Sequence, residues 1–200
     1  NMDGATLVTT RQQEQRDAAR VLGCEEVVFL PYPDAMLEPS LDLRRDLTRL
    51  IRTYKPETVV CFDPTVYWMR DFYLQHPDHR ASGEAALAAV FPSARDRLTF
   101  PELLEEGLQP HNVDEVFLAS PGDDHANRWI DIGAVIDQKI EAMLCHKSQI
   151  GDPERIETMF RTIARMTGQE QGLAYAEAYR RINLRARAFP GVGTSKPETA

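Results

Sequence analysis

A short segment from His76 to Arg80 places two histidines and an aspartate within four positions. Residues three apart share one face of a helix, so the rings of His76 and His79 can point at one ligand. Neutral imidazole is a common ligand for zinc and similar ions, and a neighbouring carboxylate such as Asp78 can orient the ring. This spacing therefore indicates a metal site or an acid–base site.

The same segment also has a purely structural explanation. Asp78 can cap the helix that starts here and leave both histidines exposed in its first turn. Three observations favour chemistry instead: both imidazoles are expected at the ligand edge of the sheet, Pro77 fixes the backbone between them, and Asp78 can hydrogen-bond a neighbouring ring nitrogen. From the spacing alone, the chemical and the structural interpretations carry about equal weight.

The flanking residues predict a strand, a loop and a helix around this segment. Thr58–Phe62 is apolar or β-branched throughout, which is typical of a strand that is covered on both faces. Ala81–Phe91 has a helical pattern. In an open α/β sheet, ligands bind in the loops that follow the carboxyl ends of the strands, so both histidines are expected at the ligand-binding edge.

The rest of the chain alternates helical and strand patterns, which predicts parallel strands joined by right-handed crossovers. The predicted helices are Arg11–Leu22, started by a Thr10/Gln13 capping box, Leu41–Tyr54, 133–146 and one that starts at Asp152-Pro153. The predicted strands are Glu26–Leu30, Glu115–Ala119 and a short edge strand, Trp129–Ile132, while Tyr175–Leu184 is predicted as a last helix or turn. The expected fold is a single α/β domain over residues 1–188, a Rossmann-like parallel sheet flanked by helices, with residues 189–200 as a disordered tail.

Composition excludes several classes of protein. The chain has 200 residues and a formal net charge of -8, which argues against a general nucleic-acid surface. No segment reaches the length of a membrane span. The three cysteines, Cys24, Cys61 and Cys145, are far apart and form no CxxC pair, so we expect neither disulfides nor a thiolate zinc site, and a cytoplasmic location fits.

The string from His76 to Ala81 (HPDHRA) belongs to a wider pattern over about residues 1–149. The other members are the turn-like residues 1–4, Arg11, Glu14, Ala18, Leu22, Gly23, Leu30, Asp34, the KPETVV string at 55–60, Asp63-Pro64 and the HKSQ string at 146–149. This pattern resembles the PIG-L/LmbE-like N-deacetylases, zinc enzymes that remove acetyl groups from N-acetylglucosamine derivatives. The HPDHRA string is specific, and the other matches are useful together.

The resemblance implies a role for each residue of the central segment. The second histidine of the family's signature binds zinc, which points to His79 and makes Zn²⁺ the expected cofactor. The first histidine stabilises the tetrahedral intermediate or acts as general acid, which points to His76. The aspartate between them tunes that histidine, which points to Asp78.

Three further residues are candidates for substrate binding, each with a structural alternative. Tyr73 lies in an aromatic loop before His76, and either a sugar site or a rigid packed loop uses such rings. Arg80 contacts substrate or pairs with a surface acid. His146 lines the pocket by its resemblance to the family's H.SQ element, or it contacts carbonyl groups at the end of a helix.

The sequence departs from the family at one point. The first signature, His-Pro-Asp-Asp, which supplies two zinc ligands and the general base, does not occur; Pro121–His125 has similar residue types in the wrong order and is predicted as an exposed loop. We therefore expect that an N-terminal piece with the first strand of the sheet is missing from this chain.

The leading hypothesis is a zinc-dependent hydrolase that removes an acetyl group from a small N-acyl amino sugar. Members of the family often form trimers or hexamers, so a homo-oligomer is expected. The alternative is a catalytically inactive fragment or pseudoenzyme that retains a sugar-binding or oligomerisation role. A nucleotide-binding domain is a weaker third hypothesis, because the sequence has no glycine-rich phosphate loop.

Overall fold

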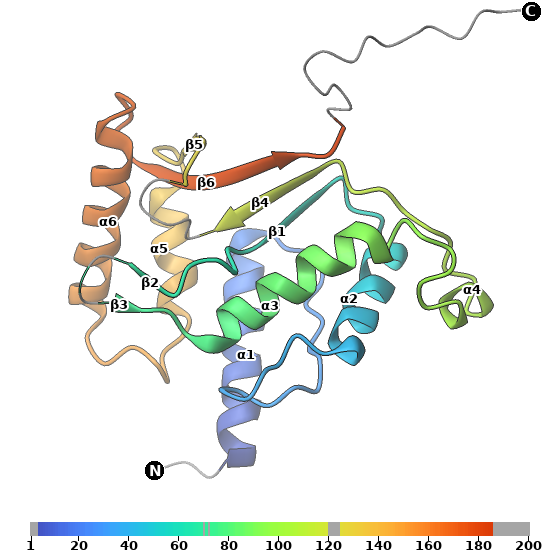
Figure 1. Ribbon diagram of the computed structural model, residues 1–200. Coiled ribbons are helices and arrows are strands. Elements are labelled where there is room, and N and C mark those ends of the chain that lie inside the picture. The colour runs from blue at the N-terminus through green and yellow to red at the C-terminus, as the bar shows by residue number, and fades with distance from the viewer. Residues whose placement is uncertain (1–3, 70, 72, 120–124, 186–200) are drawn as a thin grey trace, which may run out of the picture. The chain divides into compact units, whose positions relative to one another are not determined.

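Residues 4–69, 71, 73–119 and 125–185 are described by the computed structural model (Figure 1). They divide into two units. The first unit comprises Asn1–Tyr32 and Arg128–Ala178, and the second comprises Pro33–Asn127 and Tyr179–Ala200. The predicted tail, residues 189–200, lies outside the described residues.

The second unit is built on a mixed sheet. Strand β1 (Thr58–Phe62) pairs in parallel with β4 (Glu115–Ala119), in a register that runs from Thr58 opposite Glu115 to Phe62 opposite Ala119. Strand β6 (Ala176–Asn183) pairs antiparallel with β4 on its other side. The predicted α/β class is confirmed: β1 and β4 form a parallel pair, and β6 is an antiparallel neighbour of β4.

Helices α2 (Leu41–Tyr54) and α3 (Pro77–Ala88) pack beside β1 in this unit (Figure 1). The Ser40 hydroxyl caps α2 by accepting a hydrogen bond from the Leu43 backbone N–H at 3.2 Å, as the sequence predicts. A kinked five-residue segment, η1 (Ala89–Ser93), follows α3 and has non-helical backbone angles at Phe91; a short helix, α4 (Glu102–Glu105), comes later. The core of this unit consists of Ile51, Ala89, Val90, Ala94, Val113, Val116 and Leu118.

A glycine allows α3 to approach β1 closely. A Cβ atom added at Gly83 would lie far inside van der Waals contact of the Phe62 carbonyl oxygen. The close approach fixes where α3 lies along the carboxyl end of β1. Between β1 and α3 the chain forms a small antiparallel hairpin of β2 (Trp68–Met69) and β3 (Tyr73–Leu74) that leads into the start of α3.

The first unit contains three helices and a strand among its described residues. Helix α1 (Gly4–Leu22) contacts α5 (Ile136–Leu144), and α5 contacts α6 (Pro153–Gln169). Strand β5 (Arg128–Asp131) agrees with the predicted edge strand. As predicted, α6 starts with a proline at its first position after an Asp152 cap. Ile132, Ile136 and Ala164 form the buried cluster, against which Tyr175 packs.

Three predicted segments were wrong. Helix α1 starts at Gly4 rather than Arg11, because the helix runs without interruption through the supposed cap at Thr10. Glu26–Leu30 forms no strand, since a strand exists only through pairing and the described residues offer this segment no partner strand. The predicted last helix or turn at 175–184 is strand β6, which cross-strand contacts stabilise.

Strand β1 is also less covered than its sequence suggests. One face packs through Val59 and Cys61 against the core cluster, whereas Val60 on the other face is 60 % exposed. The strand stands last in the order β1-β4-β6-β5, so only β4 pairs with it among the described strands. A run of apolar residues therefore predicts a strand here but not how many of its faces are buried.

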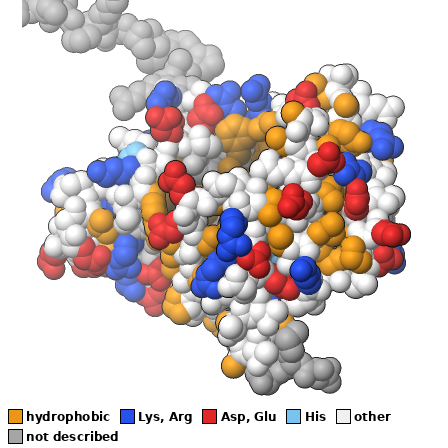
Figure 2. Space-filling model, turned by 180° about the vertical axis from the view of Figure 1, so that it is seen from behind, with side chains coloured by type: hydrophobic (Ala, Val, Ile, Leu, Met, Phe, Trp, Pro, Cys, Tyr) orange, Lys and Arg blue, Asp and Glu red, His pale blue; other side chains and the backbone are white. Residues whose placement is uncertain are grey.

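Figure 2 shows how charged side chains are distributed over one face of the described residues. On the face shown in Figure 2, acidic and basic side chains are interspersed and do not gather into one basic patch. No helix among the described residues combines the length and the apolar character that crossing a membrane requires.

Candidate functional site

His76 forms the N-cap of α3. Its backbone is extended (φ -60°, ψ 132°), and its Nδ1 accepts a hydrogen bond from the Asp78 backbone N–H at 3.2 Å. Pro77 occupies the first helical position, where a missing N–H costs nothing. Because Nδ1 acts as an acceptor, the ring proton lies on Nε2, and His76 presents an N–H donor away from the helix.

His79 is held from two sides. Its ring stacks on Phe62, with centroids 3.9 Å apart and planes at 7°. Its Nδ1 lies 2.9 Å from Oε1 of the buried Gln75, and the same oxygen accepts the backbone N–H of His76 at 3.2 Å. An oxygen at this position requires the proton on Nδ1, which leaves the Nε2 lone pair of His79 available to a ligand.

The surroundings of His79 also favour its neutral form. Burial lowers the pKa of His79, the neighbouring His76 lowers it further, and Asp78 acts in the opposite direction. Metal ions bind the neutral imidazole. His79 therefore fits the zinc-ligand role that the resemblance assigns to it: its tautomer is fixed, its ring is oriented and its protonation state is suitable.

Asp78 does not cap α3. Its carboxylate accepts two backbone N–H groups from the loop before α2, Ala35 to Oδ2 at 2.7 Å and Leu37 to Oδ1 at 3.3 Å. Ala35 has a φ of 63°, a conformation that is strained for alanine and that these hydrogen bonds help to hold. Oδ1 also lies 3.9 Å from Nδ1 of His76.

The loop held by Asp78 brings a third group to the site. Asp34, His76 and Asp78 each have a ligand atom within 4.8 Å of the others. Several of these atoms are already engaged, since His76 Nδ1 and both Asp78 oxygens accept backbone hydrogen bonds. Asp34 was missing from the predicted site, although the family pattern in the sequence contained it.

Arg80 and Tyr73 occupy the hairpin side of the site. The guanidinium of Arg80 lies 4.3 Å from the ring centroid of Tyr67 and donates a hydrogen bond to the Gln75 carbonyl oxygen at 3.2 Å. Arg80 thus braces the hairpin against α3. Tyr73 lies on β3 with 43 % of its surface exposed. Substrate contact by either residue stays a prediction.

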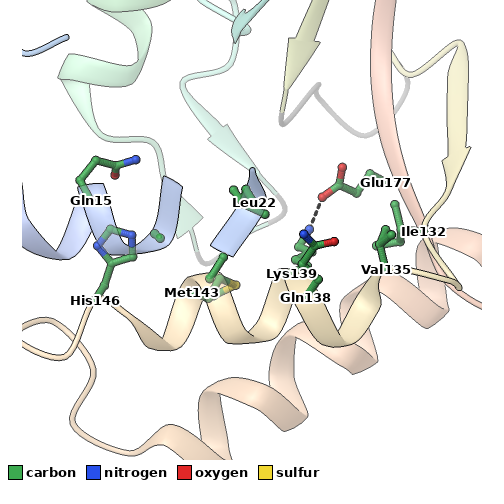
Figure 3. A pocket seen from close by; sticks show the side chains of 11 residues that line it. Gln15, Leu22, Ile132, Val135, Gln138, Lys139, Met143, His146 and Glu177 are labelled. Carbon is green, nitrogen blue, oxygen red and sulfur yellow. Dashed lines mark hydrogen bonds and ion pairs between the residues drawn. The ribbon is translucent and has the colours of Figure 1, made fainter. Parts of the chain in front are cut away.

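His146 belongs to the first unit, where it lines a pocket of about 480 Å³ between α1 and α5. Figure 3 shows His146 and Gln15 at one end of this pocket and the ion pair of Lys139 and Glu177 at the other. Among the described residues, His146 Nδ1 has no hydrogen-bond partner. Its predicted role in substrate binding stays a prediction.

Other parts of the HKSQ element have a structural role. The Ser148 hydroxyl and backbone N–H both donate to the carboxylate of Glu14 on α1, at 2.7 and 2.6 Å. Glu14 is 8 % exposed. The two sequence elements that contain Glu14 and Ser148 are thus joined by a partly buried pair of hydrogen bonds that ties α1 to the segment after α5.

Cys61 and Asp63 lie at the carboxyl end of β1. Burial raises the pKa of the Cys61 thiol to about 11, so this side chain stays a neutral thiol and is a poor metal ligand at neutral pH. Asp63 caps a turn by accepting hydrogen bonds from the Thr65 backbone N–H and hydroxyl. His125 is half exposed, as predicted, while residues 121–124 of the predicted loop lie outside the described residues.

Comparison with known proteins shows which family this chain resembles. Residues 1–90 match the family model described as "PIG-L: GlcNAc-PI de-N-acetylase". Over these 90 residues the chain is similar to the PIG-L family. A diacetylchitobiose deacetylase from Thermococcus kodakarensis is 30% identical to it over 184 residues, which cover 90% of this chain and 65% of that protein. A probable N-acetyl-α-D-glucosaminyl L-malate deacetylase 2 from Bacillus anthracis is 27% identical over 146 residues, which cover 72% of this chain and 58% of that protein.

Solved structures of PIG-L relatives support the fold. The N,N′-diacetylchitobiose deacetylase from Pyrococcus horikoshii aligns with a TM-score of 0.80 and 32% identity over 90% of this chain and 66% of that chain. The protein TT1542 from Thermus thermophilus aligns with a TM-score of 0.70 and 28% identity over 86% of this chain and 72% of its own. The chain described here spans about three fifths of the length of the curated relatives named above.

Proposed function

We propose that the protein containing this chain is a zinc-dependent N-deacetylase that acts on an N-acyl amino sugar in the cytoplasm. The observation that carries the proposal is the arrangement of His79, whose Nδ1 is fixed by Gln75 and whose ring is stacked on Phe62. The match to the PIG-L family model and the names of the two curated relatives, both deacetylases of N-acetyl sugars, support the substrate class.

Two histidines divide the chemistry between them. Nε2 of His79 would hold zinc, which would polarise the amide carbonyl and lower the pKa of a water molecule. Nε2–H of His76 donates a hydrogen bond to the oxyanion that develops when water attacks the amide. The Asp78 carboxylate lies 3.9 Å from His76 Nδ1. The proton that the attacking water loses to the general base passes to the amine as the C–N bond breaks.

Further groups must complete this site. Catalytic zinc is usually held by three protein ligands, and the described residues offer His79 as the one with a free, oriented nitrogen. The sequence has no His-Pro-Asp-Asp string for the remaining ligands and the base. We propose that these groups come from residues outside this sequence, and that the active form is a homo-oligomer.

Acetate release tests the proposal. The zinc-loaded protein that contains this chain should release acetate from N,N′-diacetylchitobiose, and H79A should abolish that release while H111A retains it. His111 is a suitable control because its Nε2 contacts the Pro56 carbonyl oxygen, at 2.8 Å, in another part of the same unit. Full activity of H79A would refute the role of His79.

A second candidate follows from the incomplete ligand set. The chain itself is then an inactive sugar-binding or oligomerisation module. Metal analysis of the purified 200-residue chain separates the two: one tightly bound zinc per chain contradicts the inactive module, and weak binding through a single imidazole agrees with it.

A further inference from the structure

Asp63 is a buried acid that the proposed mechanism does not use. It follows β1 directly and is 1 % exposed. Its Oδ1 accepts the backbone N–H of Thr65 at 2.9 Å and the Thr65 hydroxyl at 2.6 Å. Among the described residues, its Oδ2 has no hydrogen-bond partner. A buried carboxylate oxygen without a donor is costly, so a turn cap alone does not account for a full carboxylate here.

A titratable group close to this oxygen is His125. Its Nδ1 lies 4.0 Å from Asp63 Oδ2, just beyond hydrogen-bond length, and its side chain is 52 % exposed. A small rotation of the ring brings Nδ1–H within reach of the carboxylate. The exposure of the ring leaves the opposite nitrogen, Nε2, accessible from outside the protein.

The backbone around His125 is held against β6. The His125 carbonyl oxygen accepts a hydrogen bond from Arg180 at 3.3 Å. Two residues later, the Asn127 side chain bonds both the N–H and the carbonyl oxygen of Arg181, at 2.6 and 3.0 Å. Asn127 N–H also donates to the Tyr179 carbonyl oxygen at 3.0 Å. The backbone of residues 125–127 is therefore anchored to β6.

The pair lies at the same edge of the sheet as the candidate site. Phe62 pairs with Ala119 across β1 and β4, and Asp63 N–H donates to the Ala119 carbonyl oxygen at 3.2 Å. Asp63 directly follows Phe62, whose ring stacks on His79. Asp63 and His125 thus flank the loop edge where an α/β sheet binds its ligands.

We propose that Asp63 is a positioning residue for His125, and that His125 contacts a hydroxyl group of the sugar. Asp63 Oδ2 accepts Nδ1–H, which fixes the tautomer of His125, and Nε2 then accepts a hydrogen bond from the sugar hydroxyl. This inference rests on the proposed function, because it assigns a second set of contacts to the same amino-sugar site. No covalent step is involved.

The tautomer of His125 is the first test. Long-range ¹H–¹⁵N NMR correlations on the 200-residue chain should show His125 with its proton on Nδ1. D63N keeps the size of the side chain and, with Oδ1 still bonded to Thr65, turns an NH₂ group toward His125, so the proton should move to Nε2. An unchanged tautomer in D63N would overturn the positioning role. H111Q serves as the control that leaves His125 unaffected.

Sugar binding is the second test. Titration with N,N′-diacetylchitobiose should shift the ring resonances of His125 together with those of His76 and His79. H125A should weaken binding by about threefold to tenfold, the worth of one net hydrogen bond. H125Q should restore part of the affinity, because its amide can donate to Asp63 and accept from the sugar.

The outcomes separate this inference from the proposed function. If the His79 resonances shift while His125 does not respond and H125A binds normally, the sugar site stands and the role of His125 is refuted. If no histidine of the second unit responds at any sugar concentration, both the sugar site and the inference fail.

Discussion

The turn that starts α3 and the pocket beside α5 each contain a histidine that the sequence singles out, yet the two surroundings differ. His79 has one nitrogen bonded to Gln75 and its ring stacked on Phe62. His146 lies in a mainly apolar pocket, and its Nδ1 has no partner among the described residues. The first histidine is oriented for a ligand and the second is not. A family motif identifies both histidines, but their polar contacts differ: Gln75 orients His79, and no described residue bonds Nδ1 of His146.

The largest expected effect concerns the packing that places the α3 turn. G83A inserts a methyl group against the Phe62 carbonyl oxygen, so either α3 or β1 must move. We expect the free energy of unfolding to fall by about 3 kcal/mol, measured by urea denaturation with circular dichroism. G151A is the matched control, since nothing lies within 4 Å of an added Cβ there. A loss below about 1 kcal/mol would show that the close approach is not what positions α3.

The next effect tests whether the Gln75 contact makes His79 a ligand. Q75A removes the acceptor of His79 Nδ1–H. Zinc affinity of the protein that contains this chain should fall by about 10- to 100-fold in competition with a chromophoric chelator, the usual cost of losing such a partner. Q15A is the matched control: it changes a glutamine in the pocket between α1 and α5, and it should leave the zinc affinity unchanged. Equal zinc affinities of Q75A and the parent would show that the Gln75 contact does not prepare His79 to bind zinc.

A smaller effect is expected in the first unit, where the hydrogen-bonded group is the carboxylate of Glu14. Hydrogen bonds from Ser148 lower the pKa of Glu14 below its ordinary value of 4.5. A pKa that is lower in the folded state contributes stability above the unfolded pKa, and that contribution is lost as the pH falls through the folded value. E14Q should therefore flatten the dependence of the unfolding midpoint on pH on the acid side of 4.5. E25Q, at an exposed position, should retain the parent's slope.

The smallest effect is expected at His146 itself. H146L removes an unpartnered Nδ1 and keeps an apolar side chain in the pocket, so stability should stay within about 1 kcal/mol of the parent or rise. H79L, in contrast, removes one of the two hydrogen bonds to Oε1 of the buried Gln75 and should destabilise the second unit. Thermal unfolding of both variants measures the difference. Similar losses in the two variants would mean that the surroundings of these histidines are energetically alike.

Local sequence patterns predicted those elements whose signals are local. Ser40 before α2, Pro153 at the start of α6 and the β-branched run of β1 all appear in the structure as expected. Strand β6 was misassigned because its pairing with β4 depends on residues far away in the sequence, such as Ala119 opposite Tyr179 and Glu115 opposite Asn183. The exposure of Val60 depends on tertiary neighbours for the same reason.

The candidate site was predicted in part. The HPDH spacing indicated His76 and His79, and the structure brings their ring centroids to 5.5 Å. The role of Gln75 was missed, because a glutamine next to a signature histidine has no pattern of its own. The role of Asp78 toward the loop was missed as well, since its partners Ala35 and Leu37 act through backbone N–H groups that any sequence provides.

The double duty of Asp78 affects how its variants must be understood. One carboxylate lies beside His76 and also anchors the segment that carries Asp34. Reduced activity of D78A could thus result from displacement of the loop at Ala35 and Leu37 as well as from a change at the His76 imidazole. Kinetics combined with hydrogen exchange at the Ala35 and Leu37 amides would assign the defect, because only the anchor governs the protection of those two protons.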